Sequence, residues 1–216
     1  MRSIDKKALK SLLQLDFTKN VKYDYLSCIP EDLFTEKGDV YTDMYAHQHL
    51  MRQGMFIAPY WKFLRSLARI LDKKKVVEVF AGNGLITLAL QSLGINIKGV
   101  DTLTYQYYPC IDMIKSDGKQ FLQNTDEVFD VMLCIWPPYQ SSAMKDVCDA
   151  YFSKNPQGCV IYCGEDVGGC TADTSFFQYY QLIYITEIDY SPQPFLYDAF
   201  YYVTSRNACH INGLVA

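Results

Sequence analysis

The sequence lacks any long run of apolar residues. Its longest apolar stretches, such as Val131 to Trp136, are far shorter than the roughly 20 residues that a membrane-spanning helix needs. Residues Met1 to Phe17 alternate lysine with leucine and contain no apolar core of a secretory signal. We therefore expect a cytoplasmic protein that has no membrane partner.

The spacing of cysteine and histidine that typifies a metal site is also lacking. The eight cysteines include no Cys-x-x-Cys pair, and neither Cys159 to Cys163 nor Cys163 to Cys170 has a structural-zinc interval. His47 and His49 stand close together without a third ligand nearby, so a polar surface is favoured over a metal. We expect no metal site, and reduced cysteines because the cytoplasm keeps thiols reduced.

Basic residues are few and scattered. Twenty Lys and Arg against 24 Asp and Glu give a formal net charge of −4, and only the short run Lys73 to Lys75 concentrates positive charge. Proteins that clamp long nucleic acids usually carry a basic face, because neutralising phosphates supplies most of their affinity. The composition therefore disfavours a large nucleic-acid partner, and it does not indicate an oligomeric state.

From Lys75 onward the sequence alternates short apolar strands with helices. This alternation implies right-handed crossovers and a mostly parallel sheet. The last two strands, joined by 191–197 with two prolines, should form an antiparallel pair at one edge. We therefore predict a doubly wound α/β fold with a mostly parallel, seven-stranded sheet. The expected strands are 76–80, 96–100, 111–116, 128–135, 159–164, 182–190 and 199–204. One expected helix ends near residue 93, and two others span 142–152 and 171–180.

The residues before Lys75 predict two helices. Ser3 is expected to cap the first, and Pro59 suits the first turn of a second helix that reaches about Leu71. The apolar stripe of the first helix would contain Leu9, Leu12, Leu13 and Phe17. We accordingly divide the chain into an N-terminal helical lid (1–74), an α/β domain (75–206) and a tail (207–216).

A glycine turn gives the strongest chemical signal. Glu78-Val79-Phe80-Ala81-Gly82-Asn83-Gly84 stands at the end of the first expected strand, where glycines allow a tight turn and close approach of a ligand. Asp101 ends the next strand, at the place where a carboxylate can accept both hydroxyl hydrogens of a ribose. The pattern predicts a nucleotide-type cofactor. For Asp101, a solvated loop acid or a helix cap is the alternative.

The turn resembles the first motif of class I S-adenosylmethionine-dependent methyltransferases, in which an acid precedes x-Phe/Gly-x-Gly-x-Gly. The resemblance implies a Rossmann-like fold and S-adenosylmethionine as cofactor. In that family an acid after the third strand often meets the adenine, a position that Asp117 fits, although a turn acid before Gly118 is the alternative. The implied cofactor-binding residues are Glu78, Phe80, Ala81, Gly82, Asn83, Gly84, Asp101 and Asp117. A nicotinamide-dependent oxidoreductase is disfavoured by Phe80 and by Thr87, where its turn needs a small residue.

The fourth expected strand ends in Trp136-Pro137-Pro138-Tyr139. This segment resembles the Asp/Asn-Pro-Pro-Tyr motif of amino-methyltransferases that act on adenine, cytosine or glutamine amides. Two prolines stiffen the backbone, and Tyr139 offers a face to a planar substrate. Trp136 replaces the polar residue that accepts the target amine's hydrogen, which disfavours amine methylation. A rigid strand-to-helix turn is the alternative interpretation.

A third segment follows the fifth strand, where Gly164-Glu165 precedes Gly168-Gly169-Cys170-Thr171. With Trp-Pro-Pro-Tyr it resembles a set of methyltransferase-like proteins that share these motifs. Glu165 is the candidate general base or substrate anchor, with a solvated or helix-capping acid as the alternative. Thr171 is expected to cap the following helix.

Together these motifs predict methyl transfer from S-adenosylmethionine to a small-molecule acceptor. The acceptor would meet Trp136, Pro137, Pro138, Tyr139 and Glu165. In related methyltransferases the segment just upstream folds over the methionine end of the cofactor, and the resemblance implies this place for residues 45–49 and 54–59. Two alternatives remain open. One is a non-catalytic cofactor-binding or interaction module, and the other is a nucleic-acid or protein amine methyltransferase.

Overall fold

The computed structural model describes residues 3–35, 44–104, 107–192 and 196–205. Its centre is a seven-stranded sheet with the order β5-β4-β3-β6-β7-β9-β8. Strands β3 to β7 run parallel, whereas β9 is antiparallel to both of its neighbours. The predicted fold class is therefore confirmed. The strands are β3 (Lys75–Val79), β4 (Asn96–Asp101), β5 (Ile114–Lys115), β6 (Val131–Ile135), β7 (Cys159–Gly164), β8 (Tyr180–Tyr184) and β9 (Ala199–Ser205).

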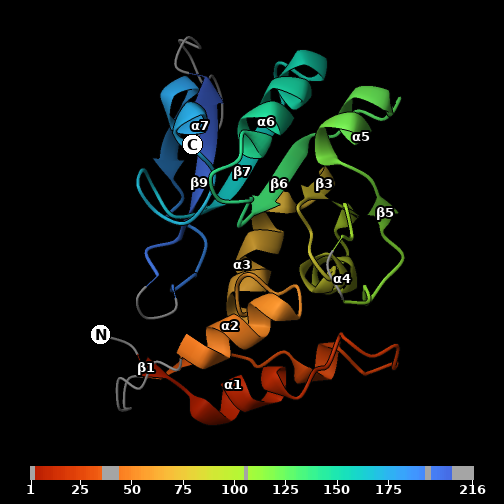
Figure 1. The fold of residues 1–216 in the computed structure, drawn as a ribbon, viewed down its shortest axis with the longest axis vertical. Helices are drawn as coiled ribbons and strands as arrows, with labels where there is room; N and C mark the ends of the chain where they lie inside the picture. Colours follow the sequence, from red (N-terminus) through yellow and green to blue (C-terminus); the bar gives the residue numbers. More distant parts are fainter. Residues whose placement is uncertain (1–2, 36–43, 105–106, 193–195, 206–216) are drawn as a thin grey trace.

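Helices cover both faces of this sheet (Figure 1). One face carries α3 (Trp61–Leu71) and α4 (Leu85–Ser92), and the other carries α5 (Gly118–Asn124), α6 (Ala143–Lys154) and α7 (Thr174–Tyr179). Because successive strand side chains point to opposite faces, the strands supply two separate cores. In β3, for example, Val76 faces the first core, whereas Val77 and Val79 face the second.

The N-terminal segment packs beyond α3 and α4, on the side away from α5 to α7 (Figure 1). Its buried side chains Leu9, Leu12 and Leu50 belong to the same core cluster as α3 and the first face of the sheet. The boundary after residue 74 stays a prediction, and the tail 207–216 lies outside the described residues. The N-terminal elements are β1 (Ser3–Ile4), α1 (Lys6–Leu13), the 3-10 helix η1 (Leu26–Cys28), β2 (Phe34–Thr35) and α2 (Met44–Arg52).

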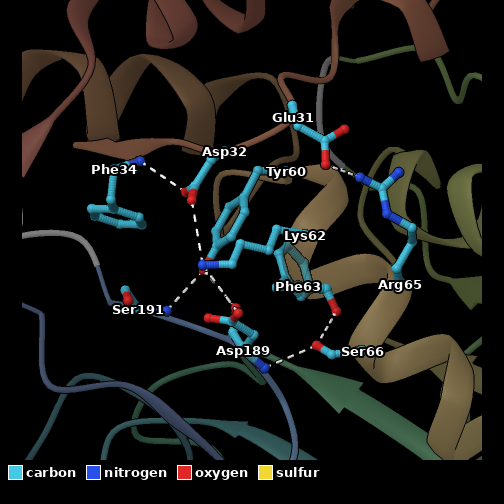
Figure 2. A network of polar contacts seen from close by, with 10 residues as sticks. All are labelled: Glu31, Asp32, Phe34, Tyr60, Lys62, Phe63, Arg65, Ser66, Asp189 and Ser191. Carbon is cyan, nitrogen blue, oxygen red and sulfur yellow. Dashed lines mark hydrogen bonds and ion pairs between the residues drawn. The ribbon is translucent and has the colours of Figure 1, made fainter. Parts of the chain in front are cut away.

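A polar network joins the N-terminal segment and the start of α3 to the connection that precedes β9, as Figure 2 shows. Lys62 Nζ lies 3.5 Å from a carboxylate oxygen of Asp32 and 3.1 Å from one of Asp189. The Tyr60 hydroxyl donates to the Asp189 carbonyl at 3.2 Å and accepts the Ser191 N–H at 2.8 Å. Exposed ion pairs contribute little, so the buried Tyr60 hydroxyl is the more important link.

Two predicted helix caps were wrong, and in each case an aspartate takes the position. Ser3 lies in β1, and the Asp5 carboxylate instead accepts the N–H of Lys7 at 2.8 Å, which caps α1. Asp173, not Thr171, caps α7. A carboxylate at this position also interacts favourably with the helix dipole, which explains the preference.

Some element boundaries differ from the prediction. The expected strand 111–116 shortens to β5, two residues long, and the expected strand 182–190 begins at Tyr180 and ends at Tyr184. Helices α2 and α5 were not predicted. They are short, with nine and seven residues respectively.

Candidate functional site

The glycine turn connects β3 to α4 through several left-handed residues. Phe80 has φ 64°, Gly82 has φ 59°, and Gly84, which precedes α4, has φ 81°. A left-handed conformation is uncommon for a residue with a side chain, so the fold holds Phe80 there against a local cost. The Ala81 N–H donates to the Val100 carbonyl at 3.2 Å, which fastens the turn to β4.

Asp101 reaches this turn from the end of β4. Its Oδ2 accepts the Gly82 N–H at 3.0 Å, and its Oδ1 accepts the Leu103 N–H at 2.8 Å. The side chain is buried, and burial raises the pKa of the carboxyl. The structure therefore brings Gly82 and Asp101 together at the carboxyl ends of two parallel strands. The strand order reverses at β3, which lies between β4 and β6, and ligands bind at such reversals in open α/β sheets.

Glu78 lies below the turn, inside the protein. The Thr87 hydroxyl donates to its Oε2, and burial raises the pKa of the carboxyl to about 8. The carboxyl is therefore protonated at neutral pH. In the sequence, Thr87 served only as evidence against a dinucleotide-binding turn. In the structure it is the hydrogen-bond partner of this buried acid.

A small cavity separates the turn from the segment that follows α2. Glu78, Phe80, Ala81 and Asn83 form one side and residues 54–57 the other, and its volume of about 20 Å³ is room for one water molecule. The Gly54 carbonyl accepts the Asn83 N–H at 3.2 Å. A Cβ on Gly82 would lie 2.2 Å from that carbonyl oxygen. Residues 54–57 thus pack directly on the predicted cofactor turn.

Trp136 begins the Pro-Pro-Tyr segment at the tip of β6. Its backbone is left-handed at φ 51°, and its ring is 7% exposed and packs edge-on against His47 of α2 with 5.5 Å between ring centroids. Pro137 is buried, Pro138 is exposed, and Tyr139 is 54% exposed. In this arrangement Tyr139, and not Trp136, presents an aromatic face to solvent.

Glu165 is buried at the end of β7, where its carboxylate organises two loops. Its Oε2 accepts the Cys170 N–H at 2.6 Å, and its Oε1 accepts the Tyr197 N–H at 3.1 Å. The Thr171 hydroxyl accepts the Glu165 N–H at 2.9 Å, which explains why Thr171 does not cap α7. The roles of Glu165 as general base or substrate anchor stay predictions.

Asp117 lies apart from these residues. Its carboxylate accepts the Gln120 N–H at 3.0 Å and caps α5, whereas the alternative interpretation of the sequence was a turn acid, and the side chain is exposed. A contact with adenine stays a prediction. Within the described ranges, no three His, Cys, Asp or Glu side chains gather in a way that could hold a metal ion. No helix among them is long and apolar enough to cross a membrane.

Asp198, a buried acid that the sequence analysis missed, lies beside Trp136. Its Oδ2 accepts the Trp136 indole N–H at 3.0 Å and the Tyr190 hydroxyl at 2.5 Å. It is 1% exposed, and burial raises the pKa of its carboxyl. The weak signal in the sequence was an acid placed directly before an expected strand, which a solvated loop acid would give equally.

No protein-family model matches the chain, and a search of curated proteins found no match. Three solved structures of methyltransferases show a distant likeness. The glycopeptide N-methyltransferase MtfA with S-adenosyl-L-homocysteine has TM-score 0.47 and 10% identity over 76% of this chain and 99% of that one. The magnesium protoporphyrin IX methyltransferase ChlM from Synechocystis PCC 6803 with bound SAM has TM-score 0.45 and 11% identity, covering 77% and 86%.

The third is the CcbJ methyltransferase from Streptomyces caelestis, with TM-score 0.37 and 12% identity over 49% of each chain. The chain thus spans about half the length of CcbJ. Identities this low concern only the arrangement of helices and strands. The sheet itself, with five parallel strands followed by the antiparallel β9, has a Rossmann-like arrangement.

Proposed function

We propose that the chain binds S-adenosylmethionine at the carboxyl ends of β3 and β4 and transfers its methyl group to a small-molecule acceptor. The observation that carries this proposal is the hydrogen bond between Gly82 and Asp101. It places a left-handed glycine turn and a buried acid together at the switch point of a doubly wound sheet, where a ribose and its neighbouring groups find backbone and carboxylate partners.

The residues present fit this cofactor in place and in chemistry. The Asp101 carboxylate lies beside the glycine turn at the carboxyl end of β4, and a carboxylate is an acceptor that suits ribose hydroxyls. The predicted residues Glu78, Phe80, Ala81 and Asn83 share one cavity wall. That cavity is far smaller than the roughly 300–1,000 Å³ of small-molecule sites. We infer that residues 54–59 move away from the turn as the cofactor enters and then cover it.

The bound cofactor supplies an electrophilic methyl group, so the chain has to hold the acceptor in line and exclude water. Pro137 and Pro138 stiffen the loop at the carboxyl end of β6, which neighbours β3 and the proposed cofactor site. Tyr139 is exposed next to them and offers a surface for an apolar or planar part of the acceptor. A small acceptor suits a chain with a net charge of −4 better than a polyanion does.

One observation favours a second candidate, a non-catalytic cofactor-binding module. Both oxygens of the Glu165 carboxylate accept backbone N–H groups, and the Trp136 ring is buried. Two residues expected to receive the acceptor therefore have structural roles. A labelled-methyl transfer assay against a small-metabolite pool separates the candidates, because a module would bind the cofactor and transfer no label.

Isothermal titration calorimetry tests the cofactor assignment. We expect micromolar binding of S-adenosylmethionine and S-adenosylhomocysteine, and no saturable binding of NAD. Tighter binding of NAD than of either adenosyl compound would overturn the proposal.

A further inference from the structure

Asp198 lies near the carboxyl ends of β6 and β7, where the proposed reaction places its acceptor. Because β9 is antiparallel to β7, the residue that precedes β9 lies beside the carboxyl end of β7, where Ala199 pairs with Gly164. Trp136 directly follows β6, at the same carboxyl end of the parallel strands. Asp198 and the Pro-Pro-Tyr segment therefore lie at the same end of the sheet, although they are distant in sequence.

The carboxylate of Asp198 is held through one oxygen only. The Trp136 indole N–H and the Tyr190 hydroxyl both donate to Oδ2, which fixes the side chain. Oδ1 is buried and has no hydrogen-bond partner among the described residues. Buried polar atoms are rarely left unpaired, and such an atom calls for a functional explanation. The Oδ1 atom is thus available to accept a hydrogen bond from a ligand.

The charges of Asp198 and Glu165 indicate which kind of ligand fits beside them. Glu165 raises the pKa of the Asp198 carboxyl through charge repulsion, in addition to the larger effect of burial. Neither acid forms a salt bridge with a Lys, Arg or His of the described ranges. Two buried acids without a cation favour a positively charged partner with N–H donors over an anion. A small amine has this chemistry.

We propose that Asp198 binds the nitrogen of a small primary or secondary amine, which is the methyl acceptor, and takes up its proton. The inference rests on the proposed methyltransferase function and names its substrate class. Asp198 thereby takes the part of the polar residue that Trp136 replaces. Indole can only donate a hydrogen bond, so Trp136 cannot accept from an amine, but it holds the carboxylate that can.

The amine binds as an ammonium ion and gives one proton to Asp198 Oδ1, which frees its lone pair. That pair forms the bond from nitrogen to the methyl carbon while the carbon–sulfur bond breaks and its electrons stay on sulfur. The products are a methylated ammonium ion and a neutral thioether, and Asp198 then releases its proton to water. Burial suits Asp198 to this work, because a raised pKa makes a carboxylate a stronger base.

Access to Asp198 follows the movement already proposed. His47, which packs on Trp136, belongs to α2, and α2 leads directly into the segment 54–59 on the glycine turn. We expect α2 to move with this segment when the cofactor enters, which would remove His47 from the Trp136 ring beside Asp198. Cofactor binding would then precede amine binding.

The test uses the Trp136 indole as a reporter in the full chain. Trp61→Phe leaves one tryptophan, so the indole N–H signal in a nitrogen-15 spectrum belongs to Trp136. Benzylamine is titrated into protein saturated with S-adenosylhomocysteine, and benzyl alcohol serves as the uncharged matched probe. We expect benzylamine to shift the signal saturably, at least tenfold more tightly than benzyl alcohol. Asp198→Asn should abolish the benzylamine shift, whereas Asp189→Asn, an exposed acid on the same connection, should preserve it.

Equal binding of the two probes, no shift by either, or an unchanged titration in Asp198→Asn would overturn the inference. Calorimetry with S-adenosylhomocysteine on each variant keeps the two proposals separate. If every variant binds the adenosyl compound while Asp198→Asn behaves like the parent, only the amine inference is wrong. If the parent protein binds no adenosyl compound, the proposed function itself fails. Folding of each variant is checked by its amide spectrum.

Discussion

The carboxylate of Asp101 accepts the backbone N–H of Gly82 at 3.0 Å, and this bond joins the end of β4 to the glycine turn. It makes Asp101 a structural residue of the turn as well as the proposed partner of the ribose. The two roles can be separated by measuring stability and ligand binding on the same variants.

We expect Asp101→Ala to weaken binding of S-adenosylhomocysteine by about 1–3 kcal/mol, the usual effect of losing hydrogen bonds to a charged group. Calorimetry measures this change, and urea unfolding measures the accompanying loss of stability. Asp112→Ala, which removes an exposed acid on the following loop, is the matched control and should bind normally. Unchanged binding in Asp101→Ala would contradict the assignment of the ribose site.

The buried Glu78 predicts a specific pH dependence of stability. Its pKa is about 8 in the folded protein, against an ordinary value of 4.5. Between these values the folded state keeps a proton that the unfolded state has lost, so the free energy of unfolding falls as pH rises through this window. The slope from this group is roughly 1.4 kcal/mol per pH unit. Glu78→Gln removes it.

Urea unfolding at pH 5, 6, 7 and 8 checks this prediction. With each increase in pH, the unfolding free energy of Glu78→Gln should rise relative to that of the parent protein. Comparing the two proteins cancels the contributions of the other titrating groups. A difference that stays constant over the four pH values would show that Glu78 titrates normally.

The contact between Gly82 and the Gly54 carbonyl predicts that an added methyl group will push the N-terminal segment off the turn. Gly82→Ala places a Cβ 2.2 Å from this oxygen, whereas the Cβ of Gly94→Ala meets nothing within 4 Å. Both glycines have positive φ, so both variants lose about 1–2 kcal/mol through backbone strain. Gly82→Ala should lose a further ~1–3 kcal/mol through steric conflict.

Hydrogen exchange locates that conflict, because the Asn83 N–H donates to the Gly54 carbonyl. We expect the Asn83 amide to exchange faster in Gly82→Ala than in Gly94→Ala. Equal exchange rates and equal stabilities would show that residues 54–57 do not rest on the turn in solution.

The sequence predicted those features that depend on local chemistry and regular patterns. The strand Cys159–Gly164 was predicted with its observed bounds, and Asp101 was correctly placed at the end of its strand, because apolar runs and glycine breaks mark both. The caps failed because an aspartate stands two residues after Ser3 and two after Thr171. Sequence preference alone does not distinguish between these candidates.

The pairing of distant residues could not be predicted. Trp136 and Asp198 meet because an antiparallel strand returns along β7, and no local pattern reveals that register. The resemblance implied that residues 54–59 cover the cofactor, but the particular contact of Gly54 with Gly82 depends on tertiary packing that no local pattern gives. Both relationships became visible only in the folded chain, and both bear on the proposed reaction.

The cysteines should differ strongly in reactivity. Cys134, Cys148 and Cys163 are fully buried and burial raises the pKa of each thiol, whereas Cys170 is exposed. Only the thiolate reacts, so among the cysteines that the structure describes native alkylation should label Cys170 first and the three buried ones only after unfolding. Peptide mass spectrometry under non-reducing conditions measures both labelling and pairing. We expect no disulfide, and a stoichiometric bridge would contradict the prediction of reduced thiols.

The last prediction concerns the acceptor. The Trp136 ring fills the space beside the Pro-Pro-Tyr segment, and its N–H is committed to Asp198. A flipped base needs room at this place, and a polyanionic strand would approach the buried acids Asp198 and Glu165. We therefore expect no methylation of adenine in DNA or RNA, and incorporation of label into small molecules instead.

A labelled-methyl transfer assay against DNA, RNA, protein extract and a small-metabolite pool measures this preference. Because Tyr139 is exposed beside the two prolines, Tyr139→Ala should reduce incorporation into the small-molecule fraction at least tenfold. Tyr179→Ala is the control, since it removes a similarly exposed tyrosine from the C-terminal end of α7. Robust labelling of adenine in nucleic acid would refute the expected acceptor class. Equal losses in the two tyrosine variants would show that Tyr139 does not contact the acceptor.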